Sequence, residues 1–184
     1  AKANLRKLLK PKALEYRDLQ LWNFPAEQAT RMEVCETQVD GKAVCYYFVR
    51  NAGAWEIEKP VPAKTTAKVE EMVKAVARLR VAGWHDDDAS KLKLYGLDPG
   101  ALQVNVTVEE TVPIAKDESA KPVDAGAAEP AADEQPTQKR TVVYKLQVAD
   151  RGPIGEDTKV FVRSGDESLV ATMFKSAADK FKPV

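Results

Sequence analysis

The run from Trp84 to Asp88, W-H-D-D-D, holds the only histidine of this 184-residue chain beside three carboxylates. An imidazole nitrogen and carboxylate oxygens are ligands that several first-row divalent metals accept. One alternative is therefore a metal-dependent enzyme that uses His85, Asp86 and Asp88. Adjacent residues do not all converge on one ion in ordinary backbone geometry, however. The favoured interpretation is a solvated run whose carboxylates cap a following helical turn.

Nucleophilic catalysis finds little support in the remaining residues. A serine or cysteine nucleophile usually needs a histidine base that a third group orients. His85 would have to serve alone, and no serine lies within a G-x-S-x-G sequence. The glycines at 96, 100, 152 and 155 lack the lysine and the spacing of phosphate-binding loops. We therefore expect a protein that is not an enzyme, with no catalytic residue and no cofactor.

The two cysteines, Cys35 and Cys45, are ten residues apart, unlike a redox C-x-x-C motif or a zinc knuckle. A hairpin with the three-residue loop Val39 to Gly41 places them directly opposite each other. That register is favoured because one face then collects apolar side chains, namely Met32, Val34, Val44, Tyr46 and Phe48. Opposed residues bring their Cα atoms to about 4.5 to 5.5 Å, within the range of a disulfide. The pair is either a disulfide, which would indicate an oxidising compartment, or two small free side chains.

Composition argues against two classes of partner. The 28 basic and 28 acidic residues cancel, so no net charge attracts the chain to nucleic acid or to an anionic membrane surface. No apolar run approaches the roughly 20 residues that span a bilayer. We expect a soluble chain. Its start at Ala1 without a methionine suggests an excised fragment, so a signal or anchor missing from this sequence says little about the parent protein.

Helical periodicity predicts one main amphipathic helix after Thr65 or Thr66. Its buried face has residues at steps of three and four, namely Val69, Met72, Val73, Val76 and Leu79. Gly83 is predicted to end this helix in a left-handed conformation. A second, short helical corner should follow the aspartates and end at Gly96.

Period-2 alternation predicts the strands around this helix. The segments are 16–24 (strand-like), 31–38, 42–50, a strand around Trp55 and Ile57, 102–108, 142–148 and 159–163. Residues 111–140, rich in proline and alanine, are predicted as a disordered insertion between two paired strands. The expected fold class is α+β, with antiparallel sheet built from hairpins. Residues 1–15 form a helical preface and 16–184 a single domain that ends in a short helix.

Three of these segments together resemble a bacterial family known as domain of unknown function 4340. They are Arg17-Asp18 to Phe24, the W-E-I-E-K-P strand from Trp55 to Pro60, and the Y-G-L-D-P corner from Tyr95 to Pro99. The corner departs from the family pattern, because Pro99 follows Asp98 directly, and the insertion is unusually long. The resemblance carries over no catalytic or binding residues.

The resemblance implies an exported protein of the bacterial envelope, often membrane-anchored and encoded near transporters of the gliding-motility type. The expected function is an extracytoplasmic binding or scaffold domain without enzymatic activity. Its partner would be a transporter component or an envelope polymer, reached through a sheet edge or through the 111–140 insertion.

Overall fold

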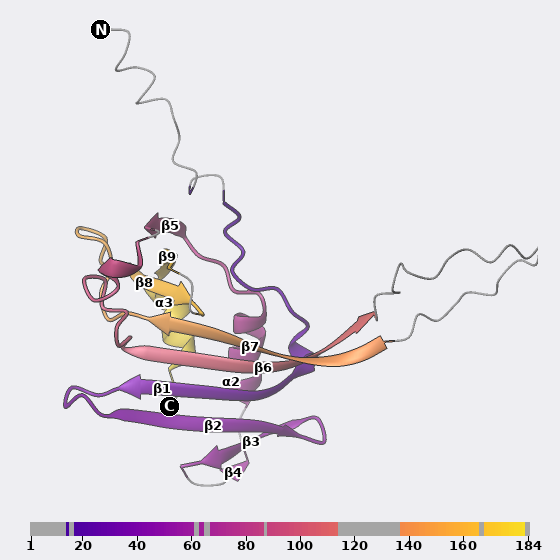
Figure 1. The fold of residues 1–184 in the computed structure, drawn as a ribbon. Helices are drawn as coiled ribbons and strands as arrows, with labels where there is room; N and C mark the ends of the chain where they lie inside the picture. Colours follow the sequence, from indigo (N-terminus) through magenta and orange to yellow (C-terminus); the bar gives the residue numbers. More distant parts are fainter. Residues whose placement is uncertain are drawn as a thin grey trace, which may run out of the picture.

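A single antiparallel sheet of nine strands organises this computed structural model, in the order β4-β3-β2-β1-β6-β7-β8-β9-β5 (Figure 1). The structure describes residues 14, 17–60, 63–64, 67–86, 88–113, 137–165 and 168–182. The strands are β1 (Ala29–Thr37), β2 (Ala43–Asn51), β3 (Ala54–Lys59), β4 (Ala63–Lys64), β5 (Gly83–Asp86), β6 (Leu102–Pro113), β7 (Thr137–Val148), β8 (Lys159–Ser164) and β9 (Val170–Phe174).

The helices that the structure describes are few and short. They are α2 (Ala67–Ala77), α3 (Lys175–Ala178) and three 3-10 turns at Ala26–Gln28, Ala89–Lys91 and Asp179–Phe181. α2 leaves β4 at one edge of the sheet and leads to β5 at the other, so it carries the chain across one face, which Figure 1 shows behind the strands. Within the described residues no helix combines the length and the apolar character that crossing a membrane requires.

The core lies between α2 and the face of the sheet that we call the inner face. Every second residue of β6 from Leu102 to Val108 is at most 4% exposed. α2 packs on this layer through the residues that its periodicity predicts, Val69, Met72, Val73 and Val76. The amphipathic helix is thus confirmed. The structure is mostly antiparallel β-sheet, so the α+β prediction is met only in part.

The β1–β2 hairpin has the predicted register. Val34 pairs with Tyr46 and Met32 with Phe48. Gln38 N–H donates to Lys42 C=O at 2.8 Å, which closes the three-residue loop, and Gly41 takes a φ of 81°. Glycine adopts this left-handed conformation without a steric cost.

The predicted end of the main helix is wrong. α2 stops at Ala77, and Gly83 begins strand β5, where it pairs with Thr172. The reason is a long-range contact, because Leu21 N–H donates to Leu79 C=O at 2.8 Å and Phe24 N–H donates to Ala77 C=O at 3.0 Å. The segment just after the helix is held by the N-terminal segment and cannot continue to coil.

That N-terminal segment is extended but is not a strand of the sheet. Its only described bridge joins Gln20 to Arg80. Trp22 and Phe24 are buried, and their rings contact Tyr144 on β7 at centroid distances of 5.5 and 4.6 Å. The prediction of a strand-like segment is therefore correct only for its extended shape.

The boundaries of the predicted insertion also change. β6 continues to Pro113 and β7 begins at Thr137, with Thr111 opposite Lys139. The pairing with a facing strand outweighs the polar composition that suggested disorder. Residues 114–136 and most of the predicted 1–15 preface lie outside the described residues.

Candidate functional site

The sheet face opposite α2, which we call the outer face, is polar over its central strands. Strand registers align one row across β2, β1, β6, β7 and β8, formed by Cys45, Cys35, Gln103, Gln147 and Arg163. The next row contains Tyr47, Glu33, Asn105 and Lys145. All of these side chains except that of Lys145 are half-buried. Half-buried polar groups on a rigid sheet are suited to bind a ligand or a partner.

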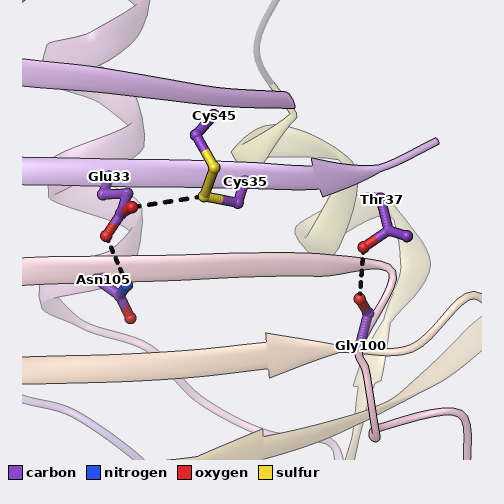
Figure 2. The surroundings of a disulfide bond; sticks show 6 residues. All are labelled: Glu33, Cys35, Thr37, Cys45, Gly100 and Asn105. Atoms are coloured by element: carbon purple, nitrogen blue, oxygen red, sulfur yellow. Dashed lines mark hydrogen bonds between the residues drawn. A yellow bond between two sulfur atoms is a disulfide. The ribbon is translucent and has the colours of Figure 1, made fainter. Parts of the chain in front are cut away.

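Cys35 and Cys45 form a disulfide, with their Cα atoms 4.0 Å apart. This result confirms the pairing that the hairpin register makes available. Figure 2 shows the disulfide beside Glu33, whose Oε1 lies 3.5 Å from Cys35 Sγ. A disulfide sulfur has no hydrogen to donate, so this is a contact and not a hydrogen bond.

Glu33 is held in place by neighbours from two other strands. Asn105 Nδ2 on β6 donates to Glu33 Oε2 at 2.8 Å (Figure 2). On β2, a hydrogen bond to the Glu33 carboxylate raises the pKa of Tyr47, and the negative charge of Glu33 adds to this effect. Asn105 thus holds Oε2 of Glu33, and Oε1 faces the disulfide.

The end of β1 is fixed to the corner that precedes β6. Thr37 Oγ1 donates to Gly100 C=O at 3.0 Å (Figure 2). Thr37 N–H donates to Ala101 C=O at 2.8 Å. The predicted short corner is confirmed here, since Gly96 has a φ of 72°. These bonds join the end of β1, next to the disulfide, to the corner that precedes β6.

Two buried polar atoms lie further along the disulfide row. Gln147 Oε1 and Arg163 Nε have no hydrogen-bond partner among the described residues, although their residues are direct neighbours on β7 and β8. Buried polar atoms are normally satisfied by protein or by water. This position is therefore suited to an ordered water molecule.

The predicted metal candidates are placed differently from one another. His85 and Asp86 lie in strand β5, and only Asp88 caps a helical turn, accepting from Ser90 N–H at 3.0 Å. Lys91 Nζ donates to Asp86 Oδ2 at 2.9 Å and lies 3.4 Å from Asp88 Oδ2. A lysine ammonium already occupies the position between these carboxylates that a cation would take.

His85 contacts two aromatic rings, one edge-on and one tilted. Its ring centroid lies 5.4 Å from that of Tyr95 and 4.9 Å from that of Phe161. Burial, followed by a hydrogen bond to Asp86, raises the pKa of Tyr95. Tyr95 and Phe161 belong to a small apolar cluster on the outer face, over β8 and β9. Packing against this cluster accounts for the presence of His85.

Among the described residues, one group of three side chains has atoms of the kind that bind metal ions within 4.8 Å of one another. The group is Glu33, Cys35 and Cys45. Sequence reasoning named both cysteines and missed Glu33. The available signal was its position two residues before Cys35, which puts both on one face of a strand.

Two hollows in the surface carry less chemistry. One of about 630 Å³ lies between Asn23–Glu27 and α2, and its Lys74 already pairs with Glu70 at 3.8 Å. Another of about 290 Å³ lies where β1 ends, beside α3, and its Lys182 pairs with Asp179 at 3.0 Å. In both hollows the lysine ammonium already has a carboxylate partner within the chain.

The outer edge of β7 is the longest open strand edge that the structure describes. β7 pairs with β6 over its full length, from Thr137 to Val148, but with β8 only from Leu146 to Val148. The two outermost strands are much shorter, with two residues in β4 and four in β5. In Figure 1 the paired ends of β6 and β7 project beyond β1.

Comparison of the chain with protein-family models found no match, and comparisons with curated proteins and with solved structures found none either. The resemblance to domain of unknown function 4340 therefore stays a prediction.

Proposed function

We propose that this chain is an extracytoplasmic binding domain without enzymatic activity, which captures an extended segment of a partner protein along the open edge of β7. The disulfide between Cys35 and Cys45 supports an oxidising compartment, because such bonds persist mainly in exported proteins. The proposed partner is a component of an envelope transporter, as the family resemblance implies. The observation that carries the proposal is the nine-residue stretch of β7 before Leu146, which has no neighbouring strand on its outer side in the described structure.

The backbone direction along this edge follows from one hydrogen bond. Gly165 N–H donates to Lys145 C=O at 2.7 Å, so the backbone groups of Lys145 point away from β6. Backbone direction alternates along a strand. The N–H and C=O groups of Thr137, Lys139, Thr141 and Val143 therefore point outward and are available to a partner strand.

Charge selects the kind of strand that this edge accepts. Lys139 and Arg140 are exposed, and the stretch from Thr137 to Lys145 contains no acidic residue, although Lys139 Nζ lies 3.8 Å from Glu109 Oε2 on β6. Basic residues on an open edge keep identical copies from pairing. An extended segment that alternates acidic and β-branched residues would pair favourably, because opposite charges across strands are stabilising.

The edge is tested with Thr141→Pro and the matched control Thr141→Ala. Proline removes an outward N–H and leaves the hydrogen bonds to β6 intact, which strand edges tolerate. The probe is a ten-residue peptide of alternating glutamate and valine, with a lysine and valine peptide as the charge control. We expect the proline variant to bind about tenfold more weakly than the alanine variant, from one lost hydrogen bond and the steric effect of the ring.

Amide hydrogen exchange gives the second readout. The acidic peptide should slow exchange at Lys139, Thr141 and Val143. Equal binding of both variants, or equal binding of both peptides, would contradict strand addition. Pull-downs from bacterial envelopes with the same two variants then identify the natural partner. A polysaccharide or a protein that both variants retain equally would show that the partner uses another surface.

A further inference from the structure

Glu33 lies beside the disulfide that joins Cys35 to Cys45. We propose that reduction of the Cys35–Cys45 disulfide converts these three side chains into a three-ligand site for a thiophilic divalent ion, such as Zn²⁺ or Cd²⁺. The ligand atoms of the three side chains already lie within 4.8 Å of one another. Two thiolates and one carboxylate form a set that such ions accept, with a fourth position left for water.

The distances fit tetrahedral coordination. With Zn–S bonds of about 2.3 Å and Zn–O bonds of about 2.0 Å, a tetrahedral ion places its sulfur and oxygen ligands about 3.5 Å apart. The observed separation of Cys35 Sγ and Glu33 Oε1 is 3.5 Å. Two sulfur ligands of one ion are about 3.8 Å apart by the same geometry, a spacing that two facing thiols reach once the covalent bond is gone.

The carboxylate is oriented before any ion arrives. Asn105 Nδ2 holds Glu33 Oε2 at 2.8 Å, and this bond leaves Oε1 on the side of the sulfurs (Figure 2). Loss of a group that hydrogen-bonds to a metal ligand and fixes its orientation typically lowers metal affinity by about ten- to hundredfold. Asn105 has this position relative to Glu33.

The opening step is a two-electron thiol–disulfide exchange with a dithiol reductant. One thiolate of the reductant attacks a cysteine sulfur, and the S–S bond breaks to give a mixed disulfide and one free cysteine thiolate. The second thiol of the reductant then attacks its own sulfur in that mixed disulfide, which releases the other cysteine and oxidises the reductant to its disulfide. Binding of the ion displaces the thiol protons into solvent.

The test is an anaerobic titration of the full chain with Cd²⁺ after reduction with a trialkylphosphine and removal of the reagent. The readout is the ultraviolet charge-transfer absorption of thiolate-bound cadmium. We expect one ion per reduced chain and no such absorption from the oxidised chain. Glu33→Gln should bind Cd²⁺ at least about tenfold more weakly. Glu36→Gln, on the same strand but the opposite face, is the matched control and should bind like the unsubstituted chain.

Two further measurements keep the outcome decisive. Far-ultraviolet circular dichroism of the reduced chain reports whether the sheet persists. The titration repeated in denaturing urea reports binding by unfolded thiols, which should show no dependence on Glu33. Equal affinity of the reduced Glu33→Gln and Glu36→Gln variants would overturn the proposal, as would a folded reduced chain that shows no thiolate absorption with Cd²⁺.

Discussion

Removing the disulfide should destabilise the fold by restoring freedom to the unfolded chain. Cys35 and Cys45 close a loop with a sequence separation of 10. The chain-entropy relation for a loop of that size gives about 2.7 kcal/mol. β1 is held between β2 and β6, and β2 between β1 and β3, so the native hairpin should persist without the bond. The loss should therefore arise mainly in the unfolded state.

The assay is urea unfolding of the oxidised chain and of the double variant Cys35→Ser/Cys45→Ser. We expect the free energy of unfolding to fall by about 2.7 kcal/mol. The melting temperature should drop by about 5 to 11 °C, because a domain of this size loses about 2 to 4 °C per kcal/mol. The m-value should rise, since an unlinked unfolded chain exposes more surface.

A control separates the cross-link from the side chains. Cys35→Ser alone removes the same bond, so its stability should equal that of the double variant within about 0.5 kcal/mol. A loss above about 5 kcal/mol would refute the reasoning, because loop entropy does not reach that value for so short a loop. A loss near zero would refute it as well, since it would mean that the hairpin constrains the unfolded chain without the bond.

Three further predictions concern single side chains. Burial and the hydrogen bond to Glu110 raise the pKa of Tyr144 from 10.0 to about 12. Its contribution to the free energy of unfolding should therefore be complete below pH 10 and lost as the pH rises to 12. Tyr144→Phe should flatten that decline when urea unfolding is measured at alkaline pH. Ser164→Ala removes the acceptor at 3.0 Å from the buried Trp22 indole N–H and should cost about 1 to 3 kcal/mol of unfolding free energy. Gly152→Ala would push a Cβ into a backbone carbonyl at the start of β8, so its melting temperature should fall clearly below that of the unsubstituted chain in thermal unfolding.

Local patterns predicted the elements whose determinants are local. The β1–β2 hairpin followed from alternation and from a loop that ends in Gly41, and the structure has that register. The apolar face of α2 followed from its periodicity. The end of α2 did not, because it depends on backbone bonds to residues near Leu21, more than fifty positions away in sequence. No window around Gly83 contains that information.

The candidate site divides in the same way. The opposition of Cys35 and Cys45 was accessible from one hairpin, and the position of Glu33 on the same face follows from period-2 alternation. The contribution of Asn105 needs the pairing of β1 with β6, which are separated by four strands and the helix α2 in the chain. Sequence therefore indicates two ligands and a third candidate, whereas the group that orients them depends on sheet order.

The two proposals place their functions at opposite ends of β6, and this separation makes them independently testable. Cys35 pairs with Gln103 near the start of β6, whereas the open edge around Thr141 faces Glu109 near its far end. β1 reaches β6 only as far as Val108, so the projecting ribbon makes no strand contact with the disulfide hairpin. Reduction should accordingly leave the affinity for the acidic peptide unchanged. If reduction instead weakened peptide binding severalfold in a chain that remained folded, the sheet would couple the two ends, and the metal site would regulate partner capture.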